Sequence, residues 1–183
     1  MNNSSRLEKD SLGSIEVESS NLWGAQTQRS LNNFAIGKDL IPIKIIYSLA
    51  LIKQSAAIAN NKLGLINEKK KALIIQASSE ILNGLHDQQF PLSVWQTGSG
   101  TQTNMNVNEV ISNIASKETC QALGSHNPLH PNDDVNCSQS TNDVFPAAIQ
   151  ISTVQEVINK LLPELDLLIN AFEAKVKDWN HII

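Results

Sequence analysis

The chain has 183 residues, of which 41% are hydrophobic and 17% are charged, so it can form one ordinary domain or one domain and the beginning of a second. Its 14 basic and 18 acidic side chains give a net charge of -4, which excludes a broad positive surface for nucleic acid or an anionic membrane. No apolar stretch approaches the ~20 residues that cross a bilayer, so no membrane partner is expected.

The cysteines indicate the cellular compartment. Cys120 and Cys137 occur in a chain without a basic and apolar leader, a pattern typical of free thiols in a reducing environment. We therefore expect a soluble, cytoplasmic protein.

The first forty residues are polar and carry no helical stripe, so they predict short strands and turns. Residues 14–18 alternate polar and apolar side chains, which predicts one half-buried strand after a turn at Leu12 and Gly13.

From Pro42 onward, apolar side chains recur at helical spacing. The repeat predicts a helix that stops at Gly64 and buries one face, made of Ile45, Leu49, Ile52, Ala56, Ala59 and Leu63. Asn67 can cap a second helix that ends before Gly84. Its predicted buried face consists of Ile74, Ala77 and Ile81. The two helices should form an antiparallel hairpin.

Two polar stretches each lead into a further helix. Residues 90–104 predict a loop before a helix that contains Val107 and Ile114, and residues 124–143 predict a second loop before a helical run over 145–179. Pro163 lies inside that run and predicts either a kink or a break between consecutive helices near Leu162.

The first polar stretch has the composition of an anion site. Gly98 and Gly100 allow the backbone to approach a ligand, the neighbouring hydroxyl groups are neutral donors, and the following helix adds a partial positive charge. The lysine of a phosphate loop and the elbow motif of serine hydrolases are both missing. A solvated helix cap uses the same residue types and remains an alternative.

The second polar stretch does not predict a metal site. His126 and His130 have a spacing found in zinc sites, but Pro128 between them prevents the helix that this spacing requires. The adjacent aspartates lack the ligand order and the glycine of an EF-hand. A turn explains the composition, yet residues 140–142 place uncharged hydrogen-bonding groups before an apolar helix, which suits a ligand with a carboxylate and a hydroxyl group.

Several motifs together closely resemble the class II fumarases. They are the runs at residues 98–110, 130–136 and 138–143, with an N-terminal signature at residues 8–13 and 23–30. Aspartases of the same superfamily share part of this pattern, and Thr141 is more usual among them. However, residues 23–27 and 97–103 are fumarase-like, which favours the first family.

The resemblance implies a mainly α fold and a homotetramer. Residues 1–140 would be an N-terminal lyase domain with short strands at its start, and residues 141–183 would be the first helices of an incomplete central helix bundle. Family subunits are much longer, and the segments with their catalytic histidine and serine would follow Ile183. No catalytic residue is therefore expected in this chain.

The implied function is the reversible hydration of fumarate to L-malate in the tricarboxylic acid cycle, without a metal ion or another cofactor. By resemblance, this dicarboxylate is bound by Ser99, Gly100, Thr101, Ser140, Thr141 and Asn142. A second dicarboxylate site of bacterial members would match His130, Pro131, Asn132 and Asp133. Asn127 stands where some members have a basic residue, which weakens this second match. An aspartate ammonia-lyase and a non-catalytic helical interaction module remain as alternatives.

Overall fold

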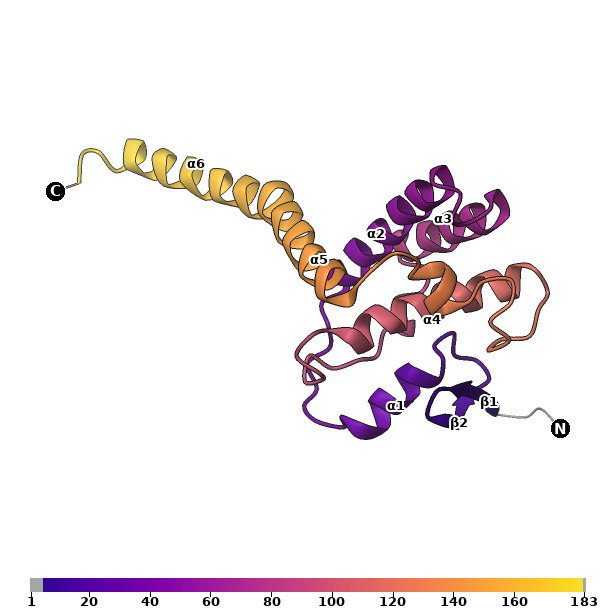
Figure 1. Ribbon diagram of the computed structural model, residues 1–183. Coiled ribbons are helices and arrows are strands. Elements are labelled where there is room, and N and C mark those ends of the chain that lie inside the picture. The colour runs from indigo at the N-terminus through magenta and orange to yellow at the C-terminus, as the bar shows by residue number, and fades with distance from the viewer. Residues whose placement is uncertain (1–4, 183) are drawn as a thin grey trace.

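The fold is mainly α, as predicted, in the computed structural model, which describes residues 5–182 (Figure 1). The strands and α-helices within these residues are β1 (Ser5–Asp10), β2 (Gly13–Glu18), α1 (Ala25–Asn33), α2 (Ile43–Lys62), α3 (Glu68–Leu82), α4 (Thr101–Glu118), α5 (Thr141–Glu156) and α6 (Leu162–Asp178). Short helical turns cover Asp87–Gln89, Pro131–Val135 and Val157–Leu161. In Figure 1, α4 runs through the main body between the α2–α3 pair and α1 with the strands, and α5 and α6 extend away as an arm.

The predicted strand at residues 14–18 is confirmed, but the region around it also contains a helix. β1 and β2 pair antiparallel, with Ser5 opposite Glu18 and Asp10 opposite Gly13. The nine-residue helix α1 corrects the expectation of strands and turns only. Its few apolar residues give no clear stripe in the sequence, so its stability depends on contacts with distant parts of the chain.

The start of α1 is held by a carboxylate from α4. Glu109 accepts hydrogen bonds from the backbone N–H groups of Gly24, Gln26 and Thr27 at 2.9, 2.8 and 3.2 Å, and from the Thr27 hydroxyl group at 2.6 Å. A negative charge at a helix N-terminus is stabilising. Burial raises the pKa of Glu109 to about 7, while these four donors act in the opposite direction.

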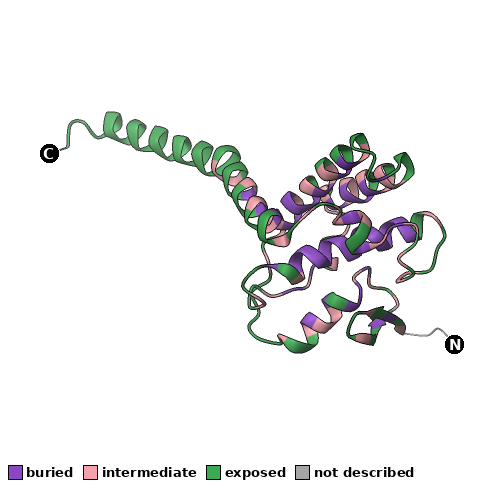
Figure 2. Cartoon of the chain, viewed as in Figure 1, coloured by how far each residue is buried: buried purple, intermediate pink, exposed green. Residues whose placement is uncertain are grey.

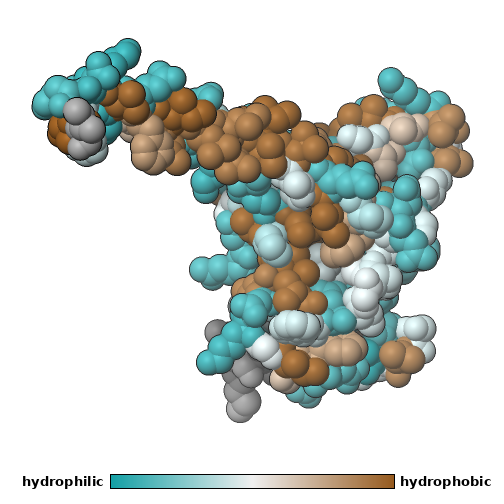
Figure 3. All heavy atoms as spheres, turned by 90° about the vertical axis from the view of Figure 1, so that its left-hand side faces the viewer, coloured by the Kyte–Doolittle hydropathy of each residue, from teal (hydrophilic) through white to brown (hydrophobic). Residues whose placement is uncertain are grey.

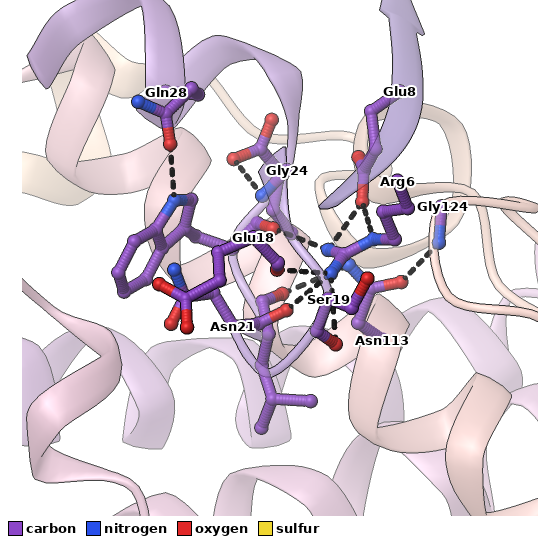
Figure 4. A network of polar contacts seen from close by, with 12 residues as sticks. Arg6, Glu8, Glu18, Ser19, Asn21, Gly24, Gln28, Asn113 and Gly124 are labelled. Atoms are coloured by element: carbon purple, nitrogen blue, oxygen red, sulfur yellow. Dashed lines mark hydrogen bonds and ion pairs between the residues drawn. The ribbon is translucent and has the colours of Figure 1, made fainter. Parts of the chain in front are cut away.

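Arg6 connects the β-hairpin to the segment before α1 (Figure 4). Its guanidinium group donates to the Glu8 carboxylate at 2.6 Å and to the backbone carbonyl groups of Asn21 and Trp23 at 2.7 and 2.8 Å. Asn113 of α4 accepts a hydrogen bond from the Gly124 N–H group at 2.8 Å in the same region. Residues of the N-terminal signature, such as Glu8 and Trp23, thus take part in the contacts that join the hairpin to the segment before α1.

The predicted helical hairpin is confirmed, with α2 and α3 side by side in Figure 1. The Asn67 side chain caps α3 by accepting a hydrogen bond from the Lys70 N–H group at 2.9 Å. The predicted face of α3 is buried, namely Ile74, Ala77 and Ile81.

The predicted buried face of α2 is confirmed only in part, because Leu49 is buried and Ile45 and Ile52 pack against the core, but its C-terminal half is not buried. Ala59 and Leu63 are exposed, although the apolar repeat placed them on the buried side. The residues that are buried are Ile46, Ser48, Leu49, Ala50, Lys53, Ala57 and Asn60. A buried lysine and a buried asparagine belong to the true face, so an analysis of apolar spacing could not identify it.

Helix α4 forms the centre of the core. Every residue from Thr103 to Ser116 is buried, and Figure 2 shows this helix as the most continuously buried segment. The helix begins at Thr101, so the predicted loop over 90–104 is too long. Its first turn is polar in sequence yet packed in the structure, where the Thr103 hydroxyl group accepts a hydrogen bond from Gln96 at 2.8 Å.

The predicted helical run over 145–179 begins earlier, at Thr141, and continues through Pro163 into α6. The wide turn Val157–Leu161 directly precedes α6, so the irregularity predicted near Leu162 is present, while the backbone stays helical through it. Proline lacks the N–H group that would continue the α-helical hydrogen bonds, and the change to a wider turn before it is compatible with this missing donor.

Helix α6 exposes its apolar side chains, which appear as brown patches along the arm in Figure 3. The exposed residues of this helix and the turn before it include Ile158, Leu161, Leu162, Leu165, Leu168, Ile169 and Phe172. Within residues 5–182, no helix is both long and apolar enough to span a membrane.

Candidate functional site

The two polar motifs meet where α4 and α5 begin. Gly100 precedes α4 with a φ of 71°, and a Cβ atom at this position would lie 2.3 Å from Cδ1 of Phe145 in α5. Only glycine combines this backbone angle with so close a contact. The first loop therefore packs directly against α5, although the two segments are distant in the sequence.

Asn104 links the two motifs by hydrogen bonds. Its side-chain amide donates to the Thr141 hydroxyl group at 3.0 Å and to Oδ1 of Asn136 at 3.1 Å. Its own Oδ1 atom is buried and accepts no hydrogen bond from residues 5–182. The amide group of Asn104 thus fixes the start of α5 beside α4.

The residues expected to bind substrate form one group, which we call the helix-end site: Ser99, Gly100, Thr101, Ser140, Thr141 and Asn142. The Ser99 and Thr101 hydroxyl oxygens lie 2.9 Å apart. Ser140 occupies the N-cap position of α5, but its side chain makes no capping hydrogen bond. These hydroxyl groups are therefore not used as helix caps, which was the simpler explanation of the sequence.

Both helix N-termini at this site retain unpaired backbone donors. The N–H groups of Thr101, Gln102, Thr141 and Asn142 have no acceptor among the described residues. The aligned peptide dipoles add a partial positive charge at each helix end. Two such ends beside one another, with neutral hydroxyl and amide groups around them, suit a small anion.

A lysine of α2 donates hydrogen bonds to the segment that precedes α5. Lys53 is 0% exposed, and its Nζ atom donates to Oδ1 of Asn136 at 2.8 Å and to Oε1 of Gln139 at 2.9 Å. In the described part of the chain, no carboxylate forms an ion pair with it. Burial lowers the pKa of Lys53 to about 7.

The residues of the expected second site form a turn that His130 caps. Its Nδ1 atom accepts hydrogen bonds from the N–H groups of Asn132 at 3.3 Å and Asp133 at 3.1 Å. The Asp133 carboxylate lies 3.4 Å from the same Nδ1 atom. Asp134 accepts from the His130 N–H group at 2.8 Å and pairs with Lys70 at 2.6 Å, which fixes the turn.

This turn borders a separate cavity of about 530 Å³, which we call the histidine cavity. Its lining residues include His126, His130, Pro131, Asn132, Lys9 and Glu109. The residues of the helix-end site do not line it, and neither does Asp133. The two groups of predicted site residues thus lie in two different places.

Among residues 5–182, the two histidines of the cavity do not form a metal site. The His126 and His130 rings meet edge to face, with their centroids 4.8 Å apart. Within the described residues, no three His, Cys, Asp or Glu side chains form a metal cluster.

Comparisons with known proteins identify the family of the chain. A sequence profile described as lyase matches residues 13–183. The chain belongs to the lyase family. The chain is 65% identical over 183 residues to a class II fumarate hydratase of Prochlorococcus marinus, and the match covers 100% of this chain and 39% of the relative. It is 50% identical over 183 residues to the class II fumarate hydratase of Thermosynechococcus vestitus, with the same coverage.

Solved structures support the same relationship. The crystal structure of recombinant class II fumarase from Schistosoma mansoni has a TM-score of 0.91 and 48% identity, over 95% of this chain and 37% of that one. Fumarate lyase:delta crystallin from Brucella melitensis has a TM-score of 0.92 and 40% identity, over 96% of this chain and 41% of that one. The resemblance to class II fumarases is confirmed. The chain spans about two fifths of the length of these curated relatives.

Sequence analysis missed three residues around the helix-end site. Asn104 lies in one of the motifs but was given no role there, and Phe145 and Lys53 were not singled out. A signal for Lys53 did exist, because it is four residues from both Leu49 and Ala57, on the buried side of α2.

Proposed function

We propose that the protein to which this chain belongs hydrates fumarate reversibly to L-malate, and that the helix-end site binds a carboxylate group of this substrate. The observation that supports the site best is the contact of Gly100 with Phe145, together with the Asn104–Thr141 hydrogen bond. These contacts bring two polar motifs together beside unpaired N–H groups. The names of the relatives support the reaction.

The proposed chemistry matches the character of the site. Removal of a proton beside a carboxylate of malate leaves additional negative charge on that carboxylate. Fixed N–H and hydroxyl donors stabilise such developing charge without having to reorganise. The helix-end site offers these donors from Thr101, Thr141 and Asn142, and no lysine or arginine takes part.

We propose that other segments complete the site. Ser99, Thr101, Ser140 and Asn142 are exposed in this chain, so the substrate would be open to water on one side. The general base and the histidine expected from the resemblance belong to segments outside this chain. The chain by itself is therefore expected to be inactive, because each such group contributes ~10²- to 10⁴-fold to the rate.

We propose that residues 141–183 belong to a helix bundle in a homotetramer, with the N-terminal lyase domain ending at residue 140. The exposed leucines and isoleucines of α6 support this division, since an apolar surface of this extent is typical of an interface. The free thiol groups of Cys120 and Cys137 support a cytoplasmic location.

We also propose that the histidine cavity binds a second dicarboxylate. Asn127 is exposed and does not line the cavity, but Lys9 of β1 does and can supply the cation. Titration calorimetry with malate should show two sites per chain, and Asn132→Ala should remove only one of them. A single site in the unchanged enzyme would refute this assignment.

The experiment that tests the main proposal is a measurement of two reactions on the complete enzyme. Hydration of fumarate should be followed by ultraviolet absorbance, and release of ammonia from aspartate should be followed in parallel. Hydration without ammonia release is expected. Ammonia release instead would support an aspartate ammonia-lyase, and the absence of both reactions would support a non-catalytic helical module.

A further inference from the structure

Lys53 makes contacts that the stability of α2 does not require. A buried ammonium group without a carboxylate partner is costly, and a methionine of similar length would fill the same space at lower cost. The lysine lies between Leu49 and Ala57 on the buried face of α2, and its Nζ atom points to the segment before α5. This position suggests a role in the neighbouring site.

The hydrogen bonds of Lys53 lead to the helix-end site in three steps. Lys53 Nζ donates to Oδ1 of Asn136 at 2.8 Å. The same Oδ1 atom accepts from the Asn104 amide group at 3.1 Å. The Asn104 amide group also donates to the Thr141 hydroxyl group at 3.0 Å, at the first residue of α5.

A second bond of Lys53 makes this arrangement rigid. Nζ donates to Oε1 of Gln139, whose amide group donates to the backbone carbonyl groups of Val135 and Cys137 at 3.0 and 3.1 Å. The Asn136 amide group in turn donates to the Gln139 carbonyl group at 3.1 Å. The lysine thus fixes the orientation of both side-chain amides.

We infer that Lys53 is a positioning residue for the helix-end site, which holds Asn136 in the orientation that allows Asn104 to fix Thr141 beside the N-terminus of α4. The inference rests on the proposed function, because it gives the helix-end site the role of binding substrate. Lys53 does not touch the substrate in this arrangement, and it acts through two asparagine side chains.

The protonation state of Lys53 does not alter this role. With a pKa of about 7, the amine is partly neutral near neutral pH. A neutral amine retains two N–H donors, which is the number that Asn136 and Gln139 require.

The backbone of the supporting turn has another anchor. Asn60 of α2 donates to the Cys137 carbonyl group at 2.9 Å, so the turn stays attached to α2 when Lys53 is replaced. Replacement of Lys53 should therefore disturb the side chains that it orients more than the fold.

The test compares Lys53→Met with Gln54→Met in the complete enzyme. Gln54 is the next residue of α2, and its amide group donates to Ser79 and to the Ile75 carbonyl group of α3, away from the site. Lys53→Met should lower kcat/KM by on the order of 10²-fold, because a small displacement of a binding group has an effect of this size. Gln54→Met should lower the melting temperature only. Lys53→Gln should recover part of kcat/KM, since its amide group supplies N–H donors.

Two further measurements make the result decisive. Hydrogen exchange of the Asp143 and Val144 amides, which donate to the Ser140 carbonyl group, should be faster in Lys53→Met than in Gln54→Met. Asn136→Ala should reproduce the loss of kcat/KM, and it decides the question if Lys53→Met does not fold. Unchanged kcat/KM in Lys53→Met, or in Asn136→Ala, would overturn the inference.

Failure of the inference can be distinguished from failure of the proposed function. If the unchanged enzyme does not hydrate fumarate, the proposed function fails, and the exchange measurement still reports whether Lys53 orders the start of α5. If the unchanged enzyme is active and the variants equal it, only the positioning role fails.

Discussion

The N-terminus of α1 differs from the N-termini of α4 and α5 in how its first backbone N–H groups are paired. At α1 the unpaired N–H groups are occupied by the Glu109 carboxylate, which comes from the protein itself. At α4 and α5 the first N–H groups have no acceptor within residues 5–182. A helix end that the protein fills serves stability, whereas two adjacent ends left open offer a place for an anionic ligand.

The largest effect is expected from removing donors at the open helix ends. Thr101→Val and Asn142→Ala in the complete enzyme should each lower kcat/KM by ~10²- to 10³-fold, because a fixed donor interacts most strongly with the developing charge. Steady-state kinetics and thermal unfolding on the same samples would check this. A lower melting temperature with normal turnover per folded molecule would instead assign these residues a role in stability alone.

Loss of the Glu109 carboxylate at the N-terminus of α1 should lower the stability of the protein. Glu109→Ala leaves the N–H groups of Gly24, Gln26 and Thr27 without their acceptor and should cost about 3 kcal/mol in the free energy of unfolding. Denaturant unfolding would measure the loss. A change below about 1 kcal/mol would show that the carboxylate contributes little to the start of α1.

The buried Lys53 should make stability depend on pH. Its pKa is lowered from 10.5 to about 7 in the folded protein, so between these values the unfolded chain binds more protons. Stability should therefore rise from pH 7 toward pH 10.5, and Lys53→Met should remove this rise. The melting temperature across this range would report it, with Gln54→Met as the variant that keeps the rise.

The smallest effect is expected at the N-cap of α3, which belongs neither to the start of α1 nor to the helix-end site. Asn67→Ala removes the side-chain acceptor for the Lys70 N–H group and should cost ~1 kcal/mol, with kcat/KM unchanged. A fall in kcat/KM would show that the α2–α3 hairpin takes part in positioning the site.

The sequence by itself determined what depends on neighbours along the chain. The Asn67 cap, the face of α3 that carries Ile74 and Ala77, and the strand at residues 14–18 all follow from local spacing and were predicted correctly. The motifs also indicated the candidate site residues and the family, because the types and order of their residues can be read without knowing the fold.

Only the tertiary structure decided which distant residues meet. Glu109 accepts the N–H groups at the start of α1, polar side chains in the first turn of α4 have partners in the fold, and the buried face of α2 includes Lys53 and Asn60. Spacing rules count apolar residues, so they assign a buried polar group to the surface or to a loop. Whether such a group is satisfied depends on partners remote in the sequence, such as Asn136 for Lys53 and Thr141 for Asn104. The same contacts bring the two polar motifs together, because packing, not sequence order, sets the distance between Gly100 and Phe145.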